Sequence, residues 1–221
     1  MEQINYRKEI ILWAIMLVPL LYIGYVWRSL PDTIPIHFDI HGEANGWGSK
    51  WTIFLLPAIS LGTYLLLLFV RNIDPKRMKD EASASVFFKV RIVLVVFMSF
   101  LGVLITYATV KGDMQHGLSR FLFAGIFLLF AMLGNLMINI KPNWFIGVRT
   151  PWTLSSDTVW RKTHQVIGQM WFYGGLTGAV LSFFLRDEWS GSLMFVFAIG
   201  SAIFAFAYSF WLFKKETGHE S

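Results

Sequence analysis

The stretch KPNWFIGVRTPWTLSSDTVWRKTH, residues 141–164, is a long polar interruption in a chain that is otherwise nearly all apolar. It contains two prolines, four basic residues and three tryptophans. Such an irregular segment does not cross lipid, because each unpaired backbone N–H or C=O group costs several kcal/mol in hydrocarbon. Tryptophan and arginine suit the membrane surface, where indoles are amphipathic and guanidiniums reach phosphates. We therefore expect this polar segment to lie at the interface or in a water-filled pocket.

The composition around the polar segment is that of an integral membrane protein. Of the 221 residues, 55% are hydrophobic and only 15% are charged, against about 25% charged residues in an ordinary soluble domain. Six apolar runs have the length of about 20 residues that a membrane helix needs: residues 10–27, 52–70, 90–110, 121–140, 166–185 and 192–213. The sequence predicts an all-α integral membrane protein with six transmembrane helices. The first run is not expected to be a cleaved signal, because no small-residue cleavage site follows it.

The basic residues indicate the orientation of these helices. With six spans, 14 of the 19 Lys and Arg residues fall on the side of the N-terminus and 5 on the other. By the positive-inside rule both termini are cytoplasmic, the polar segment is inside, and the loop at residues 28–51 is outside. We expect two units: a two-helix unit with that outer loop at residues 1–75, and a four-helix region with an inner loop, residues 141–165, at residues 76–221.

The outer loop offers a candidate metal site. His37, Asp39, His41 and Glu43 occupy alternate positions, so on an extended segment their side chains share one side. Imidazole and carboxylate are ligands that zinc accepts, and His37, Asp39 and His41 form the candidate zinc set. The favoured interpretation is a polar reverse turn in which His37 and Asp39 bond local backbone, because the glycines that follow predict a turn before Glu43.

The polar segment also contains charged groups that could do chemistry. Asp157, after two serines, is typical of a helix N-terminus, and the helix would run through Trp160 into the fifth span. On it Asp157 pairs with Arg161 and Trp160 with His164, because residues four apart share a face. We expect an ion pair and interfacial tryptophan anchors rather than catalysis, since no nucleophile-elbow motif accompanies His164.

The predicted spans carry no ionisable residue in their middle thirds. Proton-coupled carriers usually carry such a charge near the midplane, so a pump or ion-coupled carrier is disfavoured. Cysteine is absent, which excludes disulfides and thiolate chemistry.

Two stretches resemble a known family. The run GNLMINIKPNWFIGVRTPWTLSSDTVWRKTHQVIG is similar to the signature region of the SdpI-like immunity protein family, and LPDTIPIHFDIHGEANGWGSK resembles the small domain of unknown function that commonly precedes it. The family signature maps onto Asn143, Phe145, Gly147, Arg149, Thr150, Pro151, Trp152, Trp160, Lys162, Thr163 and His164. We add Asp157 and Arg161 to this candidate inner site.

The resemblance implies a multi-pass protein of the bacterial plasma membrane that protects its host from a secreted, membrane-active toxin peptide. It also implies a second role, in which the protein holds a cytoplasmic transcriptional repressor at the membrane, without binding nucleic acid itself. One alternative is a membrane enzyme acting on lipid or peptide, through the outer His/Asp/Glu cluster with zinc or through His164 and Arg149. Another is a lipid-organising protein with no ligand. Apart from zinc, no cofactor is expected.

Overall fold

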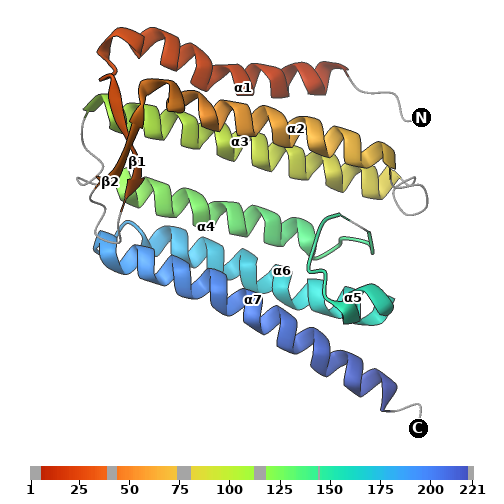
Figure 1. Ribbon diagram of the computed structural model, residues 1–221. Helices are drawn as coiled ribbons and strands as arrows, with labels where there is room; N and C mark the ends of the chain where they lie inside the picture. The colour runs from red at the N-terminus through yellow and green to blue at the C-terminus, as the bar shows by residue number, and fades with distance from the viewer. Residues whose placement is uncertain (1–5, 39–43, 74–80, 112–117, 144, 219–221) are drawn as a thin grey trace.

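Six long helices lie side by side in one bundle (Figure 1). The computed structural model describes residues 6–38, 44–73, 81–111, 118–143 and 145–218. In this part of the chain the long helices are α1 (Tyr6–Val26), α2 (Leu55–Ile73), α3 (Glu81–Lys111), α4 (Leu118–Met137), α6 (Asp157–Leu181) and α7 (Asp187–Thr217). The short elements are η1 (Trp27–Ser29), β1 (Thr33–Phe38), β2 (Ala44–Ser49), η2 (Lys50–Phe54) and α5 (Pro151–Ser155). Helix α1 begins and helix α7 ends at the same end of the bundle, which we call the terminus end (Figure 1). Helix α5 lies at this end too.

The outer surface of the bundle is apolar. Large side chains such as Leu21, Phe184 and Ile203 are more than half exposed. A soluble monomer rarely exposes contiguous apolar surface of this extent, whereas a bilayer solvates it. Within the described residues, five helices are long and apolar enough to cross a membrane: α1, α2, α3, α4 and α7. The chain is therefore a multi-pass membrane protein.

Helix α6 does not meet the same criterion of apolar composition. It is 25 residues long and contacts both α4 and α7. Glycines bring it close to α4: a Cβ at Gly168 would lie 2.7 Å from the Gly134 carbonyl oxygen, and one at Gly175 would lie 2.5 Å from the Phe127 carbonyl oxygen. Small residues allow such close backbone approach between membrane helices. Because protein surrounds much of α6, it needs fewer apolar side chains than its neighbours.

Helix α3 begins nine residues before the predicted span at Val90. The helix therefore extends well before the predicted span, and Arg91, at the start of that span, is only 2% exposed. Its Nη2 atom lies 2.7 Å from Glu9 Oε1 on α1. The Tyr64 hydroxyl on α2 donates to the other Glu9 oxygen at 2.6 Å. This buried cluster joins the first three helices, which is why the basic residue is tolerated inside the bundle.

The outer loop contains a β-hairpin, so the all-α prediction was incomplete. Strands β1 and β2 pair antiparallel, with an irregular register around His37. The hairpin lies at the opposite end of the bundle, the hairpin end (Figure 1). Leu30 and Ile34 pack with Ile23 of α1 and Ile53 of η2 in one buried cluster. The extended segment expected at His37 is present as β1, and a second strand pairs with it before the membrane helix resumes.

Candidate functional site: the polar segment as a rigid frame

Asn143 organises the turn that follows α4. Its side chain is 5% exposed. The amide nitrogen donates to the carbonyl oxygens of Lys141 and Ile146 at 3.0 and 2.9 Å. The amide oxygen accepts the backbone N–H groups of Phe145 and Ile146 at 2.9 and 2.7 Å. One side chain thus replaces a turn of regular secondary structure, which is a common use of asparagine in loops.

Gly147 and His164 lock this turn onto α6. Gly147 has φ of 120°, and a Cβ there would lie 2.3 Å from His164 Nε2. The Val148 N–H donates to that same nitrogen at 2.8 Å, so Nε2 is the acceptor. His164 Nδ1 lies 2.8 Å from the Trp160 carbonyl oxygen and is therefore the protonated nitrogen. Both ring nitrogens are occupied, which leaves neither available to act as a base on a substrate.

Burial sets the charge of His164, which lies on the part of α6 that precedes the predicted span. Desolvation lowers its pKa from 6.5 to about 4, although the hydrogen bond to the Trp160 carbonyl opposes the shift. A protonated ring would also have no lone pair for the Val148 N–H. His164 is therefore neutral at physiological pH and acts as a structural pin.

This state of His164 predicts a pH dependence of stability. The unfolded chain binds a proton near pH 6.5 and the folded chain only near pH 4. The contribution is therefore fully present above pH 6.5, and the free energy of unfolding falls as the pH drops toward 4, by about 3 kcal/mol in total. Unfolding of the purified protein in detergent, measured at pH 7.5, 5.5 and 4.5, checks this. The His164→Gln variant should lose the extra slope, and equal slopes for both proteins would contradict the assignment.

We call the hydrogen-bonded polar segment, residues 141–164, the frame. Trp160 is part of the frame and not an interfacial anchor. It is 1% exposed, and its ring stacks on His164 at 4.0 Å between centroids, which confirms that the two share a face. Its Nε1 donates to the Ile140 carbonyl oxygen at 2.9 Å, so the indole closes the turn from beneath. The anchor prediction was wrong here because a buried indole needs a hydrogen-bond acceptor, and the turn supplies one. Trp144 lies outside the described residues.

Helix α5 begins at a capping box. Thr150 is the N-cap: its hydroxyl accepts from the Thr153 N–H at 3.2 Å, and the Thr150 N–H donates to the Thr153 hydroxyl at 3.0 Å. The Thr153 hydroxyl also donates to the Val148 carbonyl oxygen at 2.8 Å. Such reciprocal bonds satisfy N–H groups that a helix start leaves unpaired. Pro151 occupies the first turn, where its missing N–H costs nothing.

Three contacts hold α5 and its N-cap residue Thr150 against α7. The Thr150 hydroxyl donates to the Ser209 hydroxyl at 3.0 Å. Trp152, half-buried, packs against Phe206 and Phe210 with centroids 4.8 Å from each. These contacts hold α5 in a fixed position against the last helix.

The predicted helix start at residues 155–157 is confirmed. Ser156 is the N-cap of α6 and accepts from the Val159 N–H at 3.2 Å, while Asp157 is the first helical residue. The Ser156 hydroxyl also donates to Glu216 Oε2 at 2.6 Å, near the end of α7. A capping serine that also contacts α7 couples the start of α6 to the end of the chain's last helix.

The candidate residues separate into an inward and an outward set. Buried within the frame are Asn143, Thr150, Trp160, Thr163 and His164. Exposed are Phe145, Gly147, Arg149, Pro151, Asp157, Arg161 and Lys162. Sequence reasoning missed Thr153, Ser209 and Glu216. The T-x-x-T spacing of the capping box could have revealed Thr153, but nothing in the sequence links the polar segment to Ser209 or Glu216.

The outer metal cluster is only partly described. His37 is exposed on β1, and its Nδ1 is hydrogen-bonded to the Asn45 side chain across the hairpin, where backbone partners were expected. Asp39, His41 and Glu43 lie outside the described residues, so the zinc hypothesis remains a prediction. No group of three metal-binding side chains occurs among the residues that the structure does describe. Nearby, Lys50 donates to Asp32 at 2.8 Å, and this bond and the lysine charge lower the pKa of Asp32.

The structure is that of a multi-pass membrane protein: an apolar helical bundle carries a hydrogen-bonded polar frame at one end, and this frame presents an ordered surface. Comparison with known proteins makes the class specific. Residues 139–209 match the SdpI/YfhL protein family, and residues 14–61 match a domain of unknown function, DUF1648. The chain is 29% identical to "Immunity protein SdpI" of Bacillus subtilis (strain 168) over 213 residues, which are 96% of this chain and 99% of that protein. No solved structure matches it. These matches confirm the resemblance that the motifs indicated: the region at residues 139–209 is similar to the SdpI/YfhL family, and the region at residues 14–61 to the domain of unknown function.

Proposed function

We propose that this chain is an immunity protein of the bacterial plasma membrane, which protects its host from a secreted, membrane-active peptide. The observation that carries the proposal is a likeness to an immunity protein that extends over nearly the whole of both chains. A membrane immunity role follows for this chain from that likeness. Experiment must identify the peptide. The proposed site consists of residues that the frame holds in place.

The proposed orientation has six crossings and two cytoplasmic termini. The helix that decides the count is α6, whose ends lie at opposite ends of the bundle (Figure 1). If α6 crosses, the start of α1, the polar segment and the end of α7 share one side of the membrane. The distribution of Lys and Arg supports the cytoplasm as that side.

The exposed members of the polar segment form the proposed inner functional face. Phe145 is 40% exposed, and Arg149, Arg161 and Lys162 also point away from the core. The buried frame fixes the backbone that carries them, so their presentation requires no ordering when a partner binds. A basic, aromatic-bearing face suits an acidic surface on a cytoplasmic protein. Holding a transcriptional repressor there would link toxin exposure to expression, and this second role is part of the proposal.

Arg149→Ala is expected to reduce protection without disturbing the fold. Arg149 is exposed, and surface substitutions usually change stability by less than about 0.5 kcal/mol. We expect survival of a sensitive bacterium under peptide challenge to fall about tenfold at equal membrane abundance. The reason is that the variant loses one charge-assisted contact that a bound partner would bury. Arg186→Ala is the matched control, since Arg186 is also exposed but is the N-cap of α7, which begins at the hairpin end (Figure 1). Equal survival of Arg149→Ala and the wild type would remove Arg149 from the site.

A further inference from the structure

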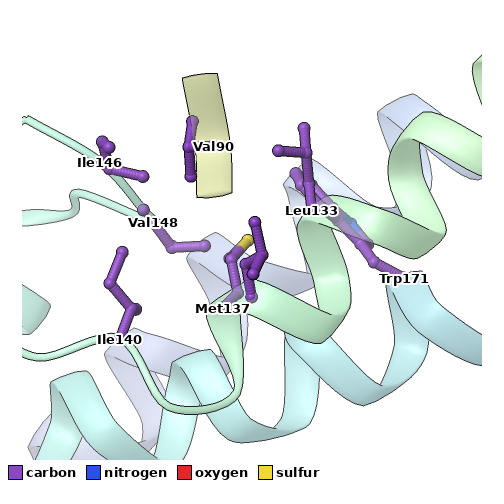
Figure 2. A pocket seen from close by; sticks show the side chains of 9 residues that line it. Val90, Leu133, Met137, Ile140, Ile146, Val148 and Trp171 are labelled. Atoms are coloured by element: carbon purple, nitrogen blue, oxygen red, sulfur yellow. The ribbon is translucent and has the colours of Figure 1, made fainter. Parts of the chain in front are cut away.

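Two neighbouring cavities lie between α3 and the frame. The first has a volume of about 170 Å³ and an almost wholly apolar lining from α3, α4, α6 and the polar segment (Figure 2). Its lining includes Val90, Leu133, Met137, Val148 and Trp171. Figure 2 shows these side chains converging from four separate parts of the chain. A dry apolar cavity of about 150 Å³ is enough to hold a benzene ring, so this one can accept a segment of a hydrocarbon chain.

The second cavity is more polar than the first and carries two lysines, although Val86, Phe87 and Ile140 also line it. It has a volume of about 280 Å³ and is lined on α3 by Ser85 and Lys89, and on the other side by Asn139, Lys141 and Asn143. The lining thus includes two ammonium groups, a hydroxyl and the Asn139 amide, whereas the Asn143 amide is engaged in the turn. These are the groups that bind a phosphate and its attached alcohol. Among the residues that the structure describes, the charged groups lining this cavity are the two lysines, and their charge favours an anion.

The two cavities adjoin each other. Ile140 lines both. Ile146, which lines the apolar cavity, packs against a cluster that contains Phe87, which lines the polar one. The last turns of α4 line the apolar cavity, and the residues that follow α4, where the chain leaves the apolar bundle for the polar segment, line the basic one. An apolar cavity toward the bundle and a basic cavity beyond it match the two ends of an amphipathic anion at a membrane surface.

From this juxtaposition we infer a binding site for an anionic phospholipid of the leaflet at the terminus end. The phosphate lies between Lys89 and Lys141, and part of one acyl chain enters the apolar cavity beside Met137. Polybasic sites at the membrane surface bind anionic headgroups in this way. The inference goes beyond the proposed immunity role and does not depend on it. Its consequence is that the lipid fills the space between α3 and the frame and so fixes their spacing.

The test is native mass spectrometry of the full chain in detergent, with phosphatidylglycerol and phosphatidylcholine of identical acyl chains. Wild type should bind phosphatidylglycerol at least about tenfold more tightly, as two lysines at a lipid surface would give. The Lys89→Gln/Lys141→Gln variant should lose that preference. Leu136→Trp, which fills the apolar cavity, should weaken both lipids. The Lys214→Gln/Lys215→Gln variant removes two exposed charges near the end of α7 and should bind like the wild type.

Two results would overturn the inference. One is equal binding of the two lipids by the wild type, which needs no variant to fold. The other is an undiminished phosphatidylglycerol preference in a folded Lys89→Gln/Lys141→Gln variant, with the fold checked by circular dichroism. Soluble glycerol phosphate distinguishes a headgroup site from a lipid site: it should not compete at equal concentration, and full competition would contradict the role of the apolar cavity. Displacement of phosphatidylglycerol from these lysines by an acidic peptide, but not by other lipids, would also overturn it.

Discussion

Replacing Gly147 by alanine should collapse the frame. At φ of 120° an L-residue is strained, which costs about 1–3 kcal/mol. The new Cβ would lie 2.3 Å from His164 Nε2, so the imidazole must move and release the Val148 N–H. Leaving a buried polar group unpaired costs a further amount of about 1–3 kcal/mol. The total, about 2–6 kcal/mol, is a large part of the stability of an ordinary domain, about 5–15 kcal/mol.

The measurement is the free energy of unfolding in detergent, together with membrane abundance and protection in cells. Gly147→Ala should be strongly destabilised and unprotective. Gly200→Ala is the matched control, because a Cβ at Gly200 in α7 meets nothing within 4 Å. In a helix that change should be neutral or stabilising by about 0.5–1 kcal/mol. A Gly147→Ala protein as stable as Gly200→Ala would show that His164 does not pin the loop.

Breaking the buried ion pair should be the second severe change. Arg91 is 2% exposed and Glu9 12%, and the two lie 2.7 Å apart. Removing one partner of a buried pair leaves an uncompensated charge and costs about 3–5 kcal/mol. We therefore expect Glu9→Leu and Arg91→Met each to destabilise strongly. The double variant removes both charges and should cost less than either single change, with a residual loss of about 1–2 kcal/mol because the Tyr64 hydroxyl loses its acceptor.

A double-mutant cycle on thermal unfolding measures this coupling. The exposed pair Arg186 and Glu188 serves as the control, since its atoms lie 3.6 Å apart and its side chains are 77% and 52% exposed. Neutralising that pair should change stability by less than about 1 kcal/mol. If the costs of the two buried substitutions simply added, the pair would not be what joins the first three helices.

The fold was predictable to the extent that lipid dictates it. Long apolar runs without charge gave the positions of the long helices, because every backbone group in hydrocarbon must bond within its own helix. The helix ends were less certain. The buried position of Arg91 was not predicted, since its partner Glu9 lies more than eighty residues away and no local pattern joins the two. The hairpin was missed because only its first strand shows regular alternation.

The site was predictable in its location but not in the role of each residue. A polar, tryptophan-rich interruption located the frame, and the serine pair before Asp157 located the start of α6. Interfacial chemistry suggested that Trp160 anchors at the surface, but the structure places it under the turn, bonded to Ile140. That role depends on how α6 packs beneath the loop. The same is true of Ser209 and Glu216, which reach the frame from the last helix.

In the proposed topology α6 crosses the membrane and so presents the polar segment on the cytoplasmic side. The chain has no cysteine, so Arg149→Cys and Arg186→Cys each carry a single thiol at an exposed position, one before and one after the crossing. A membrane-impermeant maleimide is applied to intact cells and to permeabilised cells. We expect the Arg186→Cys variant to be labelled in intact cells and the Arg149→Cys variant only after permeabilisation. Labelling of both positions from the same side would contradict it.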